Sequence, residues 1–258
     1  MRIVMIHALA ESIPPVRLAF QDVFPEAEVI NLLDEGLFID FEDKLTPKLR
    51  RRMSELICYS EEHGADAIGL ACSVYAPVVE SARELVDVPV FSSYGPVMAE
   101  AVEKGPRVGI IASVPATLRD SEYYLLKAAE EKSLSIEPML CLAEDLIPVL
   151  RKEGESGFSR RIAEEVTKLE PDVDSVLLSQ FSMATALSHV SGIAKVPVLS
   201  APHSSALAFK KLLSLAAEPA ASTPLAASKT SAPHLNYRGP LNCPRLCRFR
   251  YQSPNSCC

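Results

Sequence analysis

Cys72 is the side chain of this sequence with the clearest capacity for chemistry. It directly follows the apolar run Ala67–Ala71 and precedes a helical pattern that begins at Val74. Backbone N–H groups at the start of a helix favour a thiolate and lower the pKa of the thiol. A thiolate can remove a proton or attack an electrophile. We therefore expect Cys72 to be a proton-transfer or nucleophilic residue, the alternative being a small buried side chain.

Gln180 has the corresponding place in a second part of the chain, where it follows the apolar run Ser175–Ser179. Ligands of open α/β sheets bind beyond the carboxyl ends of the strands, so both residues are candidates for the same cleft. Further small polar or ionisable side chains stand in loops at the ends of predicted strands, and we assign them to substrate binding: His7, Ser73, Ser113, Thr117 and Ser182.

The hydroxyl groups among these candidates suit the binding of an anion. Ser73, Ser113 and Thr117 can donate hydrogen bonds to a carboxylate or to an enolate oxygen, and helix N-termini add backbone donors of the same kind. Capping of helices is the alternative role for each of them. His7 ends the first predicted strand, where it either reaches the cleft or forms structural hydrogen bonds.

These residues must be positioned by short β-rich runs that alternate with longer amphipathic helices, a pattern that predicts an α/β fold with mostly parallel sheets flanked by helices. The predicted strands are Arg2–Ile6, Glu28–Leu32, Ala67–Ala71, Val88–Ser92, Arg107–Ala112, Ile136–Leu140, Ser175–Ser179 and Val196–Leu199. The predicted helices include Thr46–His63, Val74–Leu85, Thr117–Lys132 and Ser159–Leu169.

An internal repeat relates the two halves of this pattern. The run that ends at Cys72 matches the run that ends at Gln180 at an offset of 180 − 72 = 108 residues. Val-Pro-Val-Phe-Ser from Val88 and Val-Pro-Val-Leu-Ser from Val196 have the same offset, 196 − 88 = 108. A shared register indicates duplication. We expect two pseudo-symmetric lobes with an active-site cleft between them: residues 1–95 with 198–216, and residues 96–197.

Residues 217–258 have a different composition. Pro, Ser, Ala, Arg and Cys dominate, and no Val, Ile or Met occurs there. Such a stretch buries too little apolar surface to offset the entropy of ordering, so we expect either a disordered tail or an anomalous one that comes from a mis-joined or frame-shifted coding end. The alternative is a zinc site from the cysteines of the tail, but they lack the paired spacing of structural zinc sites. They are Cys243, Cys247, Cys257 and Cys258.

Composition limits the partners. The formal net charge is −7, and without a large cluster of Lys and Arg we expect no nucleic-acid binding. No apolar run approaches the ~20 residues that span a bilayer, so we expect no membrane partner. The first residues resemble a strand and not a signal peptide, which predicts a cytoplasmic protein.

Nucleotide-binding and zinc-hydrolase motifs do not occur, so we expect no cofactor and no metal. Self-association into a homo-oligomer stays open.

Several segments resemble the aspartate/glutamate/hydantoin racemase superfamily, which includes arylmalonate decarboxylase and maleate isomerase. They are MRIVMIHALAES, GADAIGLACS, VPVFSS, RVGIIASVPAT, SVLLSQFSMA and VPVLSAP, and the resemblance covers about residues 1–213. It implies two pseudo-symmetric lobes and cofactor-independent racemisation by two cysteines on opposite faces of the substrate. Cys72 matches the first cysteine, Gln180 stands where the second should be, and Ser73, Ser113 and Thr117 match positions that bind the substrate carboxylate.

The sequence therefore predicts a cofactor-independent isomerase of the racemase type. It would transfer a proton through Cys72 at the carbon alpha to the carboxylate of a small, amino-acid-like substrate. Gln180 departs from the family pattern, because an amide cannot take up or deliver a proton as a thiolate does, and we expect it to orient the substrate. Two alternatives follow: a single-cysteine decarboxylase or cis-trans isomerase, and a small-molecule-binding protein without catalysis.

Overall fold

The structure, a computed structural model, describes residues 1–42 and 44–217. The predictions made for the tail, namely disorder and the alternative zinc site, lie outside these residues apart from Ala217 itself. Among the residues described, no helix is both long and apolar enough to cross a lipid bilayer.

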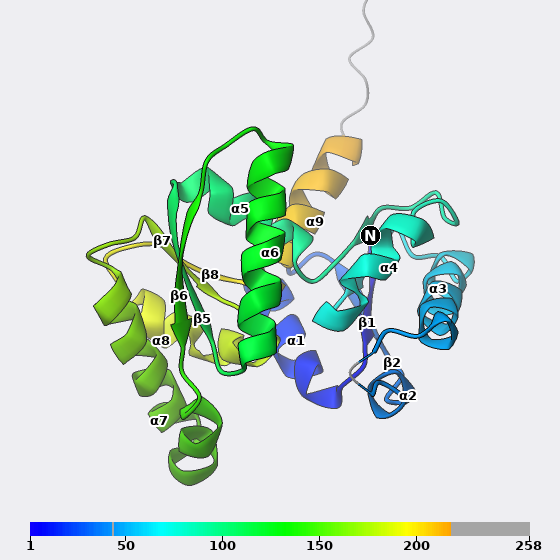
Figure 1. Cartoon of the computed structure of the whole chain (residues 1–258). Helices are drawn as coiled ribbons and strands as arrows, with labels where there is room; N and C mark the ends of the chain where they lie inside the picture. The colour runs from blue at the N-terminus through cyan, green and yellow to red at the C-terminus, as the bar shows by residue number, and fades with distance from the viewer. Residues whose placement is uncertain (43, 218–258) are drawn as a thin grey trace, which may run out of the picture. The chain divides into compact units, whose positions relative to one another are not determined.

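Within the described residues, eight strands form two parallel sheets of four strands each, which confirms the predicted α/β class and both sheets (Figure 1). The first sheet has the strand order β2-β1-β3-β4 and the second has the order β6-β5-β7-β8. The strands are β1 (Arg2–His7), β2 (Glu28–Leu33), β3 (Ala67–Leu70), β4 (Val90–Phe91), β5 (Arg107–Ala112), β6 (Glu137–Leu142), β7 (Ser175–Leu178) and β8 (Val198–Ser200). The strands inside each sheet are parallel, so their carboxyl ends meet at one edge.

The two sheets repeat the same pairing, as the sequence register predicted. Ile68 of β3 pairs with Val90 of β4, and Val176 of β7 pairs with Val198 of β8, each partner being 108 residues further along the chain. The first strand of each lobe also begins with an equivalent hydrogen bond, from a backbone N–H to an Asp carboxylate. The backbone N–H of Arg2 donates to Asp66 at 2.6 Å, and that of Arg107 donates to Asp174 at 2.9 Å.

Helices and 3₁₀ turns connect the strands. The helices are α1 (Ile13–Val23), α2 (Gly36–Ile39), α3 (Pro47–Glu62), α4 (Ala76–Ala82), α5 (Gly95–Lys104), α6 (Pro115–Glu131), α7 (Leu146–Leu169), α8 (Leu187–Ser191) and α9 (Ala201–Ala217). The 3₁₀ turns are η1 (Ala10–Ser12), η2 (Ser73–Tyr75) and η3 (Phe181–Ala186). The turns directly follow the β1 loop and the residues Cys72 and Gln180, so they belong to the edge where the strands end.

Local sequence explains where these helices begin. In α3 the side chain of Thr46 caps the helix by accepting from the N–H of Leu49 at 3.3 Å, and Pro47 supplies a fixed first turn. The helices α1, α5 and α9 also carry Pro in the first turn, and the sequence analysis did not name them. In α7 the residue Gly154, with φ +67°, interrupts the helical backbone, which is why only its second part was predicted.

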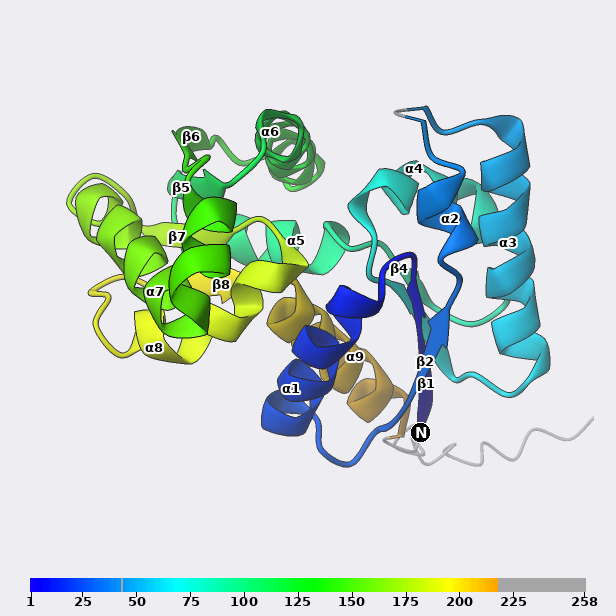
Figure 2. The ribbon, with the colours of Figure 1, turned by 90° about the horizontal axis from the view of Figure 1, so that it is seen from below.

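The fourth strand of each lobe leads into a helix that packs against the other sheet. After β4, α5 buries Val97 and Ala101 against the second sheet. After β8, α9 buries Ala206, Phe209 and Leu213 against the first sheet, where α9 and α1 lie side by side (Figure 2). We propose the predicted lobe division with one adjustment: β8 pairs with β7, so the chain returns to the first lobe at Ala201 instead of at residue 198.

Phe209 is the side chain on which this exchange of helices depends most. It is fully buried, and its ring centroid lies 4.8 Å from that of Phe91 in β4 and 6.0 Å from that of Phe20 in α1. Its ring also packs over Gly69 of β3. A Cβ added at Gly69 would lie 3.2 Å from Cε2 of the Phe209 ring. Phe209 therefore joins α9, α1 and the first sheet.

Truncation of Phe209 should destabilise the protein strongly. We expect Phe209→Ala to lower the free energy of unfolding by about 3–5 kcal/mol, because the cavity left between α9 and the sheet cannot collapse fully. Urea unfolding followed by circular dichroism measures the change. Phe38→Ala, at a phenylalanine that is 51% exposed, is the matched control and should stay within about 0.5 kcal/mol of the wild type. Equal losses in the two variants would contradict the packing role of α9.

Candidate active site

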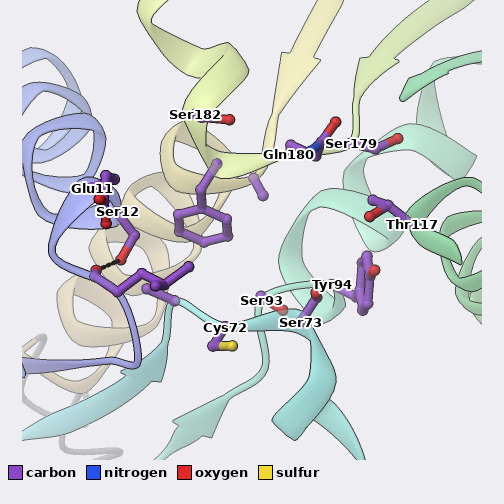
Figure 3. A pocket seen from close by; sticks show the side chains of 14 residues that line it. Glu11, Ser12, Cys72, Ser73, Ser93, Tyr94, Thr117, Ser179, Gln180 and Ser182 are labelled. Carbon is purple, nitrogen blue, oxygen red and sulfur yellow. Dashed lines mark hydrogen bonds between the residues drawn. The ribbon is translucent and has the colours of Figure 1, made fainter. Parts of the chain in front are cut away.

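A cavity of about 210 Å³ lies where the strand ends of the two lobes meet (Figure 3). Five of the residues singled out in the sequence line it: Cys72, Ser73, Thr117, Gln180 and Ser182. The remaining lining residues are Leu9, Glu11, Ser12, Ala71, Ser93, Tyr94, Ser179, Phe181 and Ala201. The loops after β1, β3, β4 and β7 all contribute, together with the first turns of α6 and α9. The cavity is large enough for a small molecule.

Cys72 lines this cavity between β3 and η2, but its thiol is not activated in the way that the sequence suggested. Burial raises the pKa of the Cys72 thiol to about 11, and the backbone N–H of Val74 opposes this shift with a smaller effect. The expected lowering of the pKa by a helix N-terminus was therefore wrong. A short 3₁₀ turn follows Cys72 in place of a long helix, so desolvation dominates. At neutral pH the sulfur carries its proton.

Gln180 is held by Ser113, which stands at the end of β5. The backbone N–H of Ser113 donates to Oε1 of Gln180 at 2.8 Å, and the Ser113 hydroxyl donates to the same oxygen at 2.7 Å. A backbone N–H can only donate, so the atom that faces it is the amide oxygen. Because Oε1 already accepts two hydrogen bonds, the Nε2 group is the part of the Gln180 amide left to act on a ligand, and it is a donor.

Ser113 itself does not line the cavity. It is 8% exposed, and its hydroxyl is used on Gln180. The sequence placed Ser113 among residues that bind the substrate, whereas its contacts are those of a residue that positions Gln180. Thr117 lies in the first turn of α6 and does line the cavity.

His7 is likewise behind the wall of the cavity and not in it. It is fully buried, with Nδ1 2.6 Å from the Ser12 hydroxyl and Nε2 2.9 Å from Oδ1 of Asn31. Burial lowers the pKa of His7 to about 4, with the Asn31 hydrogen bond opposing, so the imidazole is neutral at pH 7. His7 therefore orients Ser12, which does line the cavity.

The two ends of the cavity differ in polarity. The Ser12 hydroxyl lies 2.7 Å from the carbonyl oxygen of Leu9 and 2.6 Å from Nδ1 of His7, and its one proton is used within this group, so a lone pair is what remains for a ligand. With the carboxylate of Glu11 beside it, this end offers acceptors. Figure 3 shows Gln180, Ser179 and Thr117 at the opposite side from Glu11 and Ser12, and that side offers the Gln180 amide and hydroxyl donors.

Sequence reasoning did not assign five polar lining residues that the strand-end rule could have found. Glu11 and Ser12 close the β1 loop, Ser93 and Tyr94 follow β4, and Ser179 directly precedes Gln180. A Ser or Tyr carries too little sequence signal on its own to stand out from other polar loop residues. Within the described part of the chain, no group of three or more His, Cys, Asp or Glu side chains is arranged to hold a metal ion.

Comparison with known proteins finds a family model that matches part of the chain. Residues 37–128 match the family model described as Asp/Glu/Hydantoin racemase. No curated protein matches the chain in sequence. Residues 37–128 include Cys72, Ser113 and Thr117.

Solved structures match over most of the chain. Allantoin racemase from Klebsiella pneumoniae aligns with a TM-score of 0.66 at 19% identity, covering 90% of this chain and 95% of that one. An aspartate racemase homologue from Pyrococcus horikoshii OT3 aligns with a TM-score of 0.66 at 18% identity, covering 84% and 99%. Glutamate racemase isoform RacE1 from Bacillus anthracis aligns with a TM-score of 0.58 at 15% identity, covering 83% and 82%. These matches confirm the predicted fold.

The protonated state of Cys72 can be measured directly. We expect the rate at which iodoacetamide alkylates Cys72 to keep rising up to about pH 11, because only the thiolate reacts and burial disfavours it. Peptide mass spectrometry separates Cys72 from the other cysteines, and N-acetylcysteine in the same tube is the reference for an unperturbed thiol. A rate that levels off at or below about pH 8.5 would contradict the effect of burial.

Proposed function

We propose that this chain, which matches the Asp/Glu/hydantoin racemase family over residues 37–128 and has that fold, is a cofactor-independent isomerase of the racemase type. It moves a proton at the carbon alpha to the carboxylate of a small, amino-acid-like substrate. The observation that carries the proposal is that Cys72 and the anchored amide of Gln180 stand at equivalent strand ends and line one cavity.

Cys72 is the proton-transfer residue in this proposal. The C–H bond at the alpha carbon breaks, the proton passes to the sulfur, and the electron pair moves onto the carboxylate oxygens as an enolate. Because burial holds the pKa of the thiol at about 11, the resting thiol must first give its proton to solvent water when the substrate is bound, which leaves the thiolate. The ammonium group of an amino-acid-like substrate, bound near the sulfur, favours that charged form. The reverse step starts from the thiol, which is the resting form.

The polarity of the cavity supports this class of substrate. Nε2 of Gln180 and the hydroxyls of Ser73 and Thr117 are donors that stabilise negative charge as it develops on the carboxylate. Glu11 and the remaining lone pair of Ser12 suit an ammonium group or an N–H at the other end. We assign Ser182, at the start of η3, to the same binding shell as Ser73 and Thr117. Ser113 and His7 act through Gln180 and Ser12, so they are positioning residues.

Gln180 makes the chemistry one-sided. An amide neither accepts nor delivers a proton under ordinary conditions, so only one face of the alpha carbon meets a proton-transfer side chain. The proton on the other face then comes from water. Return of a proton to the face of Cys72 should be faster than delivery from water, because the thiol is already in place.

Exchange in deuterium oxide tests this mechanism. In this mechanism the protonated Cys72 thiol exchanges its proton with deuterium oxide while the enolate is bound, and it then returns deuterium to the same face. With enantiopure amino acids and hydantoins as probes, we therefore expect deuterium to enter the starting enantiomer faster than inversion occurs, as measured by NMR and chiral chromatography. Cys72→Ala should lower the exchange rate by about 100- to 10,000-fold, the range that a general acid–base group contributes. Cys58→Ala removes a thiol from α3, away from the cavity, and is the matched control.

Two results would contradict the proposal. Exchange at the wild-type rate in Cys72→Ala removes the assigned role of the thiol. A rate of inversion higher than the rate of deuterium entry into the starting enantiomer requires a second proton-transfer group. That result would contradict the one-sided mechanism. Circular dichroism of the variant establishes that its fold is intact.

One observation favours a second candidate, a decarboxylase. A resting thiol with a pKa of about 11 is suited to protonating an enolate that forms when carbon dioxide leaves. Substituted malonates distinguish the two functions, because a decarboxylase releases carbon dioxide and places deuterium on one face of the product. Release of carbon dioxide without exchange of amino acids would establish this candidate over the isomerase.

A further inference from the structure

Helix α6 carries a stripe of exposed side chains along one face. Residues at successive spacings of four, three and four positions lie on one face of a helix, and in α6 they are Arg119, Tyr123, Leu126 and Glu130. All four are exposed, Tyr123 at 61% and Leu126 at 45%. The stripe therefore has two apolar side chains in its middle, a cation at one end and an anion at the other.

The edge strand β6 continues this apolar surface. Leu140 and Leu142 pair with residues of β5 that pack under α6, so their side chains are on the face of the sheet that α6 covers. Because β6 is at the edge of its sheet, the two leucines are still 42% and 41% exposed. Figure 2 shows β6 and α6 next to each other. We call the stripe of α6 and these two leucines together the α6/β6 face.

The other surroundings of α6 leave this face open. Tyr124 and Ala128, on the opposite flank of the helix, line a cavity with α4 and α5, so the stripe is on the side away from those helices. The equivalent helix of the first lobe, α1, packs along α9, and among the exposed large apolar side chains of the described residues it carries Leu18 alone. An apolar patch with charges at its rim is typical of an interaction surface.

The stripe is complementary to itself, which identifies the partner as a second copy of this chain. Tyr123 and Leu126 are centred on one point of the helix, and Arg119 and Glu130 are centred on the same point. A two-fold axis at that point sets two α6 helices antiparallel. Each Tyr123 then meets Leu126 of the second copy, and each Arg119 meets Glu130 of the second copy, as a contact with two-fold symmetry requires.

The charges at the ends of the stripe are available for such a contact. Lys127, on the flank that faces α4, already pairs with Glu80. Within the described part of the chain, neither Arg119 nor Glu130 is held in an ion pair of this kind, although both are exposed. Opposite charges that meet across an interface fix its register more than they add affinity.

We propose that the α6/β6 face joins two copies of this chain in a two-fold symmetric dimer in which the α6 helices are antiparallel. Burial of the apolar side chains drives the association, and the Arg119–Glu130 pairs set the register. A two-fold contact uses the same face of both copies, so it closes with two. The same helix supplies Thr117 to the candidate active site, so the dimer contact also holds an element of that site in place.

Sedimentation velocity of the full chain at micromolar concentrations tests the dimer, with a reducing agent present so that no disulfide joins two chains. We expect a species of about 56 kDa, twice the 28.1 kDa of one chain. Leu126→Asp should weaken dimerisation by about 100-fold or more, because each copy would bury a carboxylate without a cation. Ile39→Asp, at a side chain of the first lobe that is 73% exposed, is the matched control and should leave the dimer intact.

An exchange of charges tests the antiparallel register. Arg119→Glu brings two carboxylates together at each end of the contact, and Glu130→Arg brings two guanidinium groups together. Each single change should weaken the dimer by about 10-fold. The double variant should return to within about 3-fold of the wild type, because both pairs form again with their charges reversed.

A monomeric wild type would overturn the proposal and leave the α6/β6 face to a different protein partner. A dimer that Leu126→Asp leaves intact, or that Ile39→Asp weakens equally, would overturn it as well. A double variant no stronger than the single ones would contradict the antiparallel register. A far-ultraviolet spectrum like that of the wild type separates loss of the dimer from loss of the fold, and the charge exchange at exposed side chains decides the matter if Leu126→Asp fails to fold.

Discussion

The candidate site depends on one constraint, the parallel direction of all strands within each sheet. Parallel strands place their carboxyl ends at the same edge, so residues far apart in the sequence, such as Ser12, Cys72 and Tyr94, are brought to a common loop region. The duplication applies this constraint twice. Because β3 and β7 occupy the same position in sheets of the same strand order, the residues that follow them, Cys72 and Gln180, become counterparts in one cavity.

The exchange of helices between the lobes gives this cavity a defined wall. Each fourth strand leads into a helix that packs on the other sheet, α5 on the second and α9 on the first. The residues at the two crossings, Tyr94 at the start of α5 and Ala201 at the start of α9, both line the cavity. The segments that join the lobes are thus also walls of the site. Burial of Phe209 against β4 and α1 anchors one of the two crossings.

Most of the fold could be predicted from sequence, because its signals are local and periodic. Apolar runs gave the eight strands, and the common offset of 108 residues gave the duplication. The site was less predictable because its properties depend on long-range surroundings. The charge state of Cys72 depends on burial that no local pattern reports, and the strand-end position alone suggested the opposite shift. The hydrogen bond between Ser113 and Gln180 joins residues 67 positions apart. The sequence therefore could not show that Ser113 positions Gln180 or that the oxygen of the Gln180 amide is already used.

The fold is symmetric, but its chemistry is not. At one strand end stands a thiol that can exchange a proton, and at the other an amide whose oxygen is already committed to Ser113. An amide N–H in a largely buried cavity stabilises negative charge without taking part in proton transfer. In the function that we propose, the two lobes therefore serve one intermediate in different ways: the second lobe holds the enolate oxygen, and the first lobe transfers the proton.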